Sequence, residues 1–272
     1  MSPSLQNFLP ENIMGTFLDC HSLFQQTPLS SPIFINSIPK CGTMLIRNII
    51  LMFVPLEEIH WPFVHNGNLE TYAREMEIKR FKCFTGHMQR TSKSLVSLRG
   101  FRHILNIRDP RDYVLSYAHF FFTEQLYESS KMARHIQDNE LGFDVAVDTL
   151  IRGWKFKDQA HHGVLEMFTN NGLSWFGSNC HIVRYEELKK HVENVGSQES
   201  HVYFKSMFDF LGIELTEDWE IRVKKGADYR ISKTSSEKMP SDVARRWEMT
   251  PEQKELLEQW APGLRAQLGY QD

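Results

Sequence analysis

The sequence of 272 residues contains few cysteines and only a small excess of charge. Its four cysteines form no Cys-x-x-Cys pair, which argues against a zinc site and against a disulfide framework. We therefore expect reduced thiols, as in most cytosolic proteins. Lys and Arg number 31 and Asp and Glu 34, so the net charge is −3, without the basic excess of proteins that coat nucleic acid. We expect no nucleic-acid partner.

Long hydrophobic runs are also missing. The most apolar stretch, residues 46–54, is much shorter than the roughly 20 residues that span a membrane, and it contains Arg47 and Asn48. Residues 1–10 have neither the basic start nor the long apolar segment of a secretory signal. We therefore expect a cytoplasmic protein that has no membrane partner.

The composition is that of an ordinary globular protein. Hydrophobic residues make up 41% and charged residues 24%, with no low-complexity tract, which excludes a disordered chain. A chain of this length suits one α/β domain. We predict a single domain over residues 1–272, with an N-terminal extension at residues 1–32 that ends in a stretch rich in Pro and Ser.

Short apolar runs alternate with helical patterns along the chain. Strands are predicted at residues 33–38, 81–85, 103–107 and 181–185. Helices are predicted at residues 44–50, 112–122, 143–169, 186–193, 202–211 and 251–260. This alternation indicates βαβ units, so we predict an α/β fold with a central parallel sheet flanked by helices. The basic, Ser- and Lys-rich residues 224–246 are predicted to form a lid or a solvated loop.

The turn at residues 39–43, with the sequence Pro-Lys-Cys-Gly-Thr, follows the first predicted strand and opens the first predicted helix. The free backbone N–H groups and the dipole at a helix start favour an anion. Gly42 allows close approach, Lys40 adds a positive charge and Thr43 a hydroxyl donor. The turn lacks the Gly-Lys-Ser/Thr triplet of ordinary P-loop NTPases. By itself it is equally typical of a plain βα turn with a surface lysine.

A second motif begins at Arg108, which ends a predicted strand, and reaches Ser116 two helical turns later. Ligands of open α/β sheets bind beyond the carboxyl ends of the strands, and arginine suits a phosphate there. The alternative is an Arg108 that pairs with Asp109 or Asp112, and a Ser116 on an exposed helix face. The second motif alone does not decide between them.

Together the two motifs resemble those of the cytosolic sulfotransferases, which take a sulfuryl group from 3′-phosphoadenosine 5′-phosphosulfate (PAPS) and release adenosine 3′,5′-bisphosphate (PAP). The resemblance implies a P-loop-like three-layer sandwich. It assigns Arg108 and Ser116 to the 3′-phosphate. The donor's 5′ side is assigned to the first turn and helix start, namely Lys40, Cys41, Gly42, Thr43, Met44 and Leu45.

Three further blocks, in the family's order, extend the resemblance over residues 33–260. A Thr-Gly-His sequence ends at His87, 21 residues before Arg108, and implies that His87 is the catalytic base. A Tyr-Glu-Glu-Leu sequence begins at Tyr185, which is expected near the donor. A C-terminal block at residues 246–250 follows the basic segment, where the candidate lid residues are Lys233, Ser235 and Lys238.

Two positions depart from the family pattern. Leu45 stands where many animal members have a tryptophan that stacks on adenine, so other groups must hold the base. Thr85 stands where those members have a lysine two residues before the histidine, so one cationic contact to the sulfuryl group is missing.

The acceptor is the least specified part of the reaction. The resemblance places the acceptor pocket beside four candidate residues, His60, Trp61, Phe63 and Phe120. The divergent adenine position looks more like bacterial enzymes of specialised metabolism, including those that act on guanidinium alkaloids. Carboxylates that could meet a cationic acceptor, or simply lie on the surface, are Glu57, Glu58 and Glu124. The oligomeric state stays open, a homodimer included.

The expected reaction is an in-line displacement on sulfur by a hydroxyl or amine of a small molecule. Lys40 would stabilise the leaving group and His87 would take the proton, with no metal required. One alternative is a nucleotide kinase, which needs Mg²⁺ and an acidic strand end that we do not find. The other is a non-catalytic nucleotide-binding protein of the same ancestry. The pair His161 and His162 is expected on a helix, where adjacent side chains point apart, and to face solvent or be partly buried.

Overall fold

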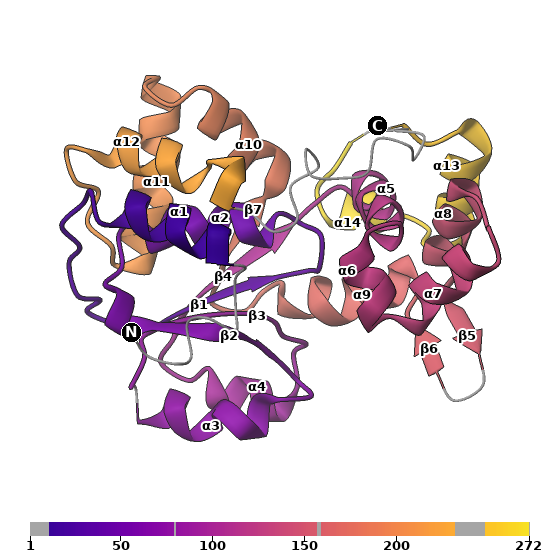
Figure 1. The fold of residues 1–272 in the computed structure, drawn as a ribbon, viewed down its shortest axis with the longest axis horizontal. Helices are drawn as coiled ribbons and strands as arrows, with labels where there is room; N and C mark the ends of the chain where they lie inside the picture. Colours follow the sequence, from indigo (N-terminus) through magenta and orange to yellow (C-terminus); the bar gives the residue numbers. More distant parts are fainter. Residues whose placement is uncertain (1–10, 79, 157–158, 232–247, 272) are drawn as a thin grey trace. The chain divides into compact units, whose positions relative to one another are not determined.

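The computed structural model describes residues 11–78, 80–156, 159–231 and 248–271. They divide into two compact units (Figure 1). The sheet unit consists of residues 11–107 and 174–231, and the helical unit consists of residues 108–173 and 248–271. The single domain over residues 1–272 remains a prediction.

The sheet unit is built on five parallel strands in the order β2-β3-β1-β4-β7. The strands are β1 (Ile33–Ser37), β2 (Ile59–His65), β3 (Cys83–His87), β4 (Arg102–Ile107) and β7 (Cys180–Arg184). The predicted parallel α/β architecture is therefore confirmed. Because all five strands run the same way, their carboxyl ends share one edge, where ligands of such sheets bind.

Strand β2 was not expected from the sequence. Pro62 lies inside it, and its register with β3 shifts between Ile59 and Phe63. Proline removes a ladder hydrogen bond and is confined to edge strands or bulges, and β2 is at the edge of the sheet. The strand predicted at residues 81–85 is shifted by two residues and ends at His87.

Helices cover both faces of the sheet (Figure 1). Those on one face are α1 (Glu11–His21), α2 (Thr43–Leu51), α10 (Tyr185–Glu193), α11 (Gln198–Leu211) and α12 (Trp219–Gly226). Those on the other are α3 (Leu69–Glu77) and α4 (Ser92–Ser97). Short 3₁₀ turns are η1 (Leu56–Glu58), η3 (Tyr229–Ile231) and η2 (Leu173–Trp175), the last at the boundary between the units.

The core of the sheet unit lies between β1 and α2. Ile35 is fully buried against Ile46 and Ile49 of α2. Burial of one such side chain stabilises the fold by about 1.5–3 kcal/mol. Helix α1, in the predicted N-terminal extension, belongs to this core as well: the Phe17 ring is fully buried and packs edge-on against Trp61, with ring centroids 5.6 Å apart.

The helical unit contains a small hairpin among its helices. The helices are α5 (Pro110–Phe121), α6 (Glu124–Ser129), α7 (Lys131–Asp138), α8 (Phe143–Arg152), α9 (Val164–Asn171), α13 (Pro251–Trp260) and α14 (Leu264–Gln267). The two strands of the hairpin, β5 (Trp154–Phe156) and β6 (Gln159–His161), pair antiparallel. Thr250 and Gln253 form a reciprocal capping box at the start of α13, which agrees with its predicted start.

Three local predictions were wrong. The single helix predicted at residues 143–169 is split into α8, the hairpin and α9, because Gly153 has a φ of 87° and ends α8. His161 ends β6 instead of lying on a helix, and the His162 side chain contacts Glu166. Part of the predicted lid, residues 224–226, is the last turn of α12; residues 232–247 lie outside the described part of the chain.

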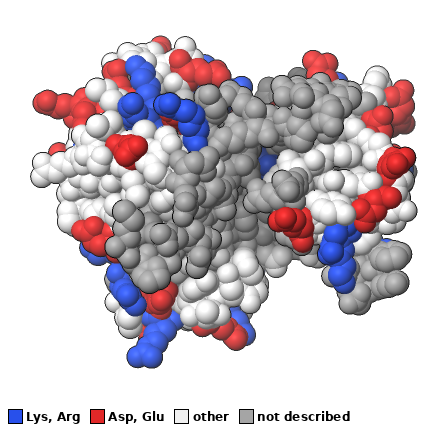
Figure 2. All heavy atoms as spheres, viewed as in Figure 1, with Lys and Arg blue, Asp and Glu red and all other residues white. Residues whose placement is uncertain are grey.

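Acidic and basic side chains are interspersed on the face in Figure 2, over the part of the chain that the structure describes. No helix in the described ranges is both long and apolar enough to cross a membrane.

Candidate active site

The loop at residues 38–43 lies at the carboxyl edge of the sheet, between β1 and α2. Two of its residues have left-handed backbone conformations, Lys40 with a φ of 63° and Gly42 with a φ of 84°. A Cβ atom on Gly42 would lie only 2.2 Å from Cδ2 of Tyr185, the first residue of α10. Gly42 is therefore required both by its φ and by the ring that packs on it.

Hydrogen bonds from β4 hold this loop in place. Asn106 donates from its side-chain Nδ2 to the Cys41 carbonyl at 2.6 Å, and its main-chain carbonyl accepts from the Ile38 N–H at 3.2 Å. Cys41 is fully buried, and its N–H donates back to the Ile38 carbonyl at 3.2 Å. The loop is thus held by its own main-chain hydrogen bond and by the main chain and side chain of Asn106.

The start of α2 is suited to an anion. In the described structure Gly42, at the N-cap position, provides no side-chain cap, and the first turn contains no acidic residue. The first N–H groups of the helix are therefore left for a ligand. Thr43 begins the helix, and the half-buried Met44 and Leu45 pack against the core of the sheet unit.

His87 ends β3 at the same edge, beside the loop. Its Nδ1 lies 2.7 Å from the Ser37 carbonyl oxygen, to which it must donate, so Nε2 is the proton acceptor of the neutral ring. Burial lowers the pKa of His87 to about 4, although the Ser37 hydrogen bond raises it and His65 lowers it further. His87 is therefore neutral at pH 7. The Phe63 ring packs against it at a centroid distance of 5.4 Å.

Two strand residues around His87 were missed by sequence reasoning. Asn36 holds the segment after β3 in place, since Oδ1 accepts from the Met88 N–H at 2.8 Å and Nδ2 donates to its carbonyl at 3.1 Å. His65 is the register partner of His87 on β2. The signal for Asn36 was present, a buried amide inside an apolar strand, whereas His65 could be placed only once β2 was known.

Two of the residues proposed for the acceptor lie in packed surroundings. His60 is 2% exposed, stacks on Phe84 and contacts Glu75 at 3.1 Å. Burial lowers the pKa of His60, while Glu75 raises it. Trp61 is also buried, with the guanidinium of Arg47 5.1 Å from its ring centroid. Of the β2 residues predicted for the acceptor, the structure brings Phe63 alone to His87.

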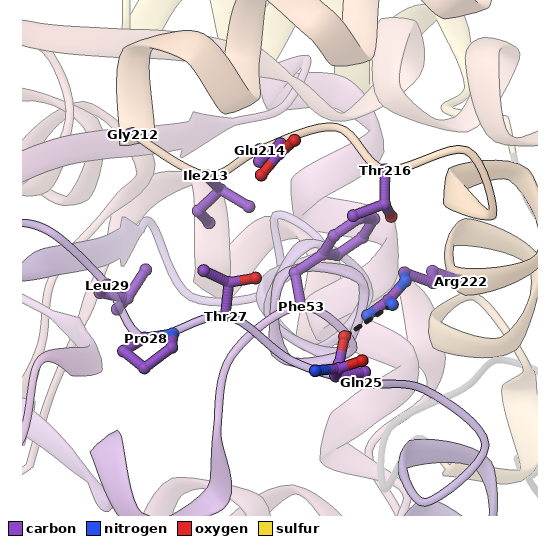
Figure 3. Close-up of a pocket in the computed structure, with 10 residues that line it drawn as sticks. All are labelled: Gln25, Thr27, Pro28, Leu29, Phe53, Gly212, Ile213, Glu214, Thr216 and Arg222. Atoms are coloured by element: carbon purple, nitrogen blue, oxygen red, sulfur yellow. Dashed lines mark hydrogen bonds between the residues drawn. The ribbon is translucent and has the colours of Figure 1, made fainter.

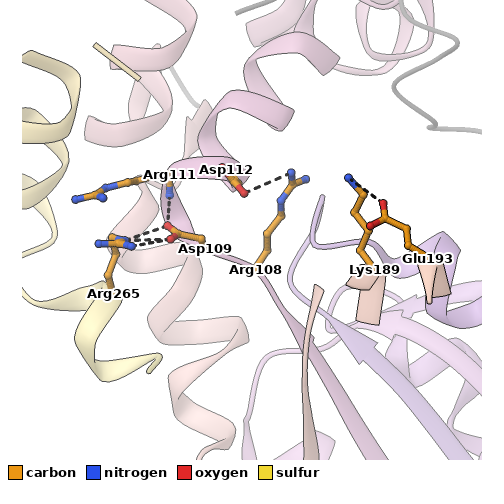
Figure 4. A network of polar contacts seen from close by, with 7 residues as sticks. All are labelled: Arg108, Asp109, Arg111, Asp112, Lys189, Glu193 and Arg265. Carbon is orange, nitrogen blue, oxygen red and sulfur yellow. Dashed lines mark hydrogen bonds and ion pairs between the residues drawn. The ribbon is translucent and has the colours of Figure 1, made fainter. Parts of the chain in front are cut away.

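The second motif opens α5 in the helical unit (Figure 4). Asp109 caps the helix by accepting from the Arg111 N–H at 2.9 Å, and Pro110 is its first residue. Arg108 lies 3.9 Å from Asp112, the alternative pairing expected from the sequence, at a distance typical of a loose ion pair. Ser116 is 8% exposed, two turns along the helix.

The remaining predicted residues fall elsewhere. Phe120 is half-buried near the end of α5 and packs against Tyr117 with ring centroids 6.3 Å apart. The three lid candidates, Lys233, Ser235 and Lys238, lie outside the described residues. The side chain of Glu124 is also outside them. Among the residues that the structure describes, no cluster of His, Cys, Asp or Glu could hold a metal ion.

A pocket of about 310 Å³ in the sheet unit lies away from this site (Figure 3). It is lined by residues that precede β1 and by Phe53, which follows α2, so it lies at the amino edge of the sheet. Arg222, which lines the pocket, donates from its guanidinium to the main-chain carbonyls of Gln25 at 2.8 Å and Met52 at 2.9 Å. This pocket is a gap around a structural arginine.

Comparisons with known proteins agree with this geometry. The family model described as "Sulfotransferase domain" matches residues 30–265. The fold is similar to that of mouse sulfotransferase SULT7A1 complexed with PAP, with a TM-score of 0.54 and 16% identity over 97% of this chain and 93% of that chain. None of the curated proteins compared with this chain matches its sequence significantly.

Proposed function

The chain belongs to the sulfotransferase domain family and is a sulfotransferase, and we propose that it moves a sulfuryl group from PAPS to a hydroxyl or amine of a small molecule. The observation that carries the proposal is the loop at residues 38–43. Its left-handed Lys40 and Gly42 lead into a helix start that has no capping side chain or acid in the described structure. Such a loop suits the 5′-phosphosulfate of the donor.

The donor's two ends would be held in different ways. At the 5′ end, the N–H groups at the start of α2 and the Thr43 hydroxyl would donate to the phosphosulfate. At the 3′ end, Arg108 and Ser116 of α5 would take the phosphate. The ion pair of Arg108 with Asp112, at 3.9 Å, is loose enough for a doubly charged phosphate to compete with it. The Tyr185 ring, packed on Gly42, would form one wall of the site.

Catalysis would depend on the fixed tautomer of His87. Because Nδ1–H donates to the Ser37 carbonyl, Nε2 presents a lone pair to the attacking hydroxyl or amine. With a pKa of about 4, His87 is a weak base that stays unprotonated at physiological pH. It would therefore take the proton late, as the S–O or S–N bond forms and the nucleophile becomes acidic. Lys40 would stabilise the negative charge on the departing PAP.

The acceptor is proposed only as a small molecule with a hydroxyl or amine. Glu58, one carboxylate considered for a cationic acceptor, instead binds Lys82 at 2.7 Å and the Leu29 N–H at 2.8 Å. It precedes β2 and so lies at the amino edge, opposite the loop. A guanidinium alkaloid, bacterial specialised metabolism and a cytoplasmic location stay as expectations from the sequence.

A calorimetric titration tests the donor site first. The protein is titrated with PAP and separately with ADP, without Mg²⁺, because these ligands differ mainly in the position of the second phosphate. We expect a clear preference for PAP, followed by sulfated product when PAPS and an acceptor panel are supplied. A preference for ADP would favour the kinase alternative. PAP binding without any sulfated product across the panel would favour a non-catalytic protein.

A further inference from the structure

The most strongly bonded charge pair near α5 joins Asp109 to Arg265 of α14, 156 positions apart in the sequence (Figure 4). The Arg265 Nε donates to both carboxylate oxygens, at 3.2 and 3.1 Å, and Nη2 donates to Oδ2 at 2.9 Å. The two side chains are only 13% and 16% exposed. Fork-shaped arginine–carboxylate pairs of this kind are among the strongest polar contacts in proteins.

Arg265 is itself held from the other side. Its Nη2 also donates to the Gln271 carbonyl at 2.8 Å, and Leu264 and Leu268, which flank it, are buried. The guanidinium is therefore fixed in front of the α5 N-terminus by the C-terminal segment. Its position does not depend on α5 alone.

Asp109 directly follows Arg108, the residue proposed for the 3′-phosphate. Its carboxylate binds Arg265 and the Arg111 N–H, while Arg108 forms an ion pair with Asp112. Among the described residues, the charged side chains at the start of α5, together with Arg265, are three arginines and two aspartates, a net charge of +1: Arg108, Asp109, Arg111, Asp112 and Arg265. Without Arg265 that charge is zero.

We propose that Arg265 is a positioning residue for the 3′-phosphate site, which neutralises Asp109 and keeps this carboxylate from competing with the phosphate for Arg108. The proposal rests on the proposed function, because it assumes that Arg108 binds the 3′-phosphate. It adds a residue from the C-terminal segment that acts through Asp109 and does not touch the donor itself.

The test compares three variants, Arg265→Gln, Asp109→Asn and the double variant, by titration with PAP and with adenosine 5′-monophosphate, which lacks the 3′-phosphate. Asp109→Asn keeps a good helix cap and removes the charge. We expect Arg265→Gln to weaken PAP about tenfold and leave the monophosphate unchanged, because it restores a competing anion beside Arg108. Asp109→Asn should bind PAP at least as tightly as the parent protein, and the double variant should return close to it.

Two controls keep the result interpretable. Lys205→Gln removes one cation from an exposed pair with Asp209 on α11 of the sheet unit, and should change neither affinity. If Arg265→Gln does not fold, Arg265→Lys keeps the charge without the fork and should bind PAP within about threefold of the parent protein.

Equal losses of PAP and monophosphate affinity, or equal losses in both single variants with no recovery in the double, would overturn the proposal and leave the pair a structural clamp. Arg108→Ala separates the two hypotheses. If this variant keeps the full preference for PAP over the monophosphate, the 3′-phosphate assignment itself is wrong. If it loses the preference while Arg265→Gln retains it, the Arg265 inference alone fails.

Discussion

The two segments that we propose for the donor's phosphates are built in different ways. In the sheet unit, the loop at residues 38–43 is shaped by backbone conformation and by hydrogen bonds of its main chain to the side-chain amide and the main-chain carbonyl of Asn106. In the helical unit, the start of α5 is shaped by charged side chains, with Asp109 held by Arg265 and Arg108 near Asp112. The first segment should therefore respond to changes of shape and the second to changes of charge.

Gly42→Ala should have the largest effect on donor binding, because it breaks the shape-dependent site. The added Cβ would lie 2.2 Å from the Tyr185 ring, at a φ of 84° that disfavours any side chain. We expect PAP affinity to fall by about hundredfold or more, measured by calorimetry.

Gly100→Ala is the matched control, because Gly100 has a φ of 80° with nothing within 4 Å of the added atom. It should cost about 1–2 kcal/mol of unfolding free energy and no affinity. Equal affinity losses in the two variants would contradict this account.

His87→Ala tests the chemistry at the same edge of the sheet. Loss of the proposed base should lower the sulfuryl-transfer rate by about 10²–10⁴-fold, a typical contribution of general-base catalysis. PAP affinity should stay within about threefold, because His87 is assigned to the acceptor's proton and not to the donor. Single-turnover rates and calorimetry measure the two quantities separately. Retained turnover would remove His87 from the mechanism.

Arg108→Ala tests the charge-dependent site. A charge-assisted contact to phosphate contributes about 1.5–3 kcal/mol, so PAP affinity should fall by about 10- to 100-fold. The variant should bind adenosine 5′-monophosphate nearly as tightly as the parent protein does. In the parent protein, the preference for PAP over the monophosphate should become smaller with added salt. A salt-independent preference would mean that shape, not charge, recognises the 3′ end.

The last expected effect, which does not involve donor binding, is a pH dependence of stability in the sheet unit. Burial lowers the pKa of both His87 and His103 to about 4, whereas unfolded histidine titrates near pH 6.5. Between these values the unfolded chain binds more protons, so stability falls as the pH drops from 7 to 5, by about 2 kcal/mol for each histidine. Urea unfolding at the two pH values measures the loss. His103→Gln should reduce the loss by about 2 kcal/mol, and an unchanged loss in that variant would exclude His103 as a source.

Local patterns in the sequence were enough for the elements that depend on local chemistry. The βα turn at residues 39–43 and the helix at residues 251–260 are short-range features that agree with the structure, and α5 begins two residues before the start predicted for it. Features set by distant residues could not be inferred. Strand β2 contains Pro62 and pairs with β3, which is distant in the sequence. The Asp109–Arg265 pair joins segments 156 residues apart, and nothing in either segment indicates the other.

The helix predicted across residues 143–169 failed for a related reason. The apolar spacing continues through the region, but Gly153 adopts a φ of 87° and the chain turns into a hairpin. Glycine permits this conformation without requiring it, so the sequence alone does not indicate the break. The buried contacts of His60 could not be predicted either, because its partners, Glu75 and Phe84, come from other elements.

The left-handed backbone of Lys40 has a consequence for the evolution of this protein. A lysine with a φ of 63° costs about 1 kcal/mol relative to glycine, so the position is not optimised for folding. In a library of variants selected for thermal stability alone, position 40 should change to glycine or asparagine, and the charge that we propose for the leaving group would be lost. Selection for stability and selection for the proposed activity would therefore favour different residues at this position.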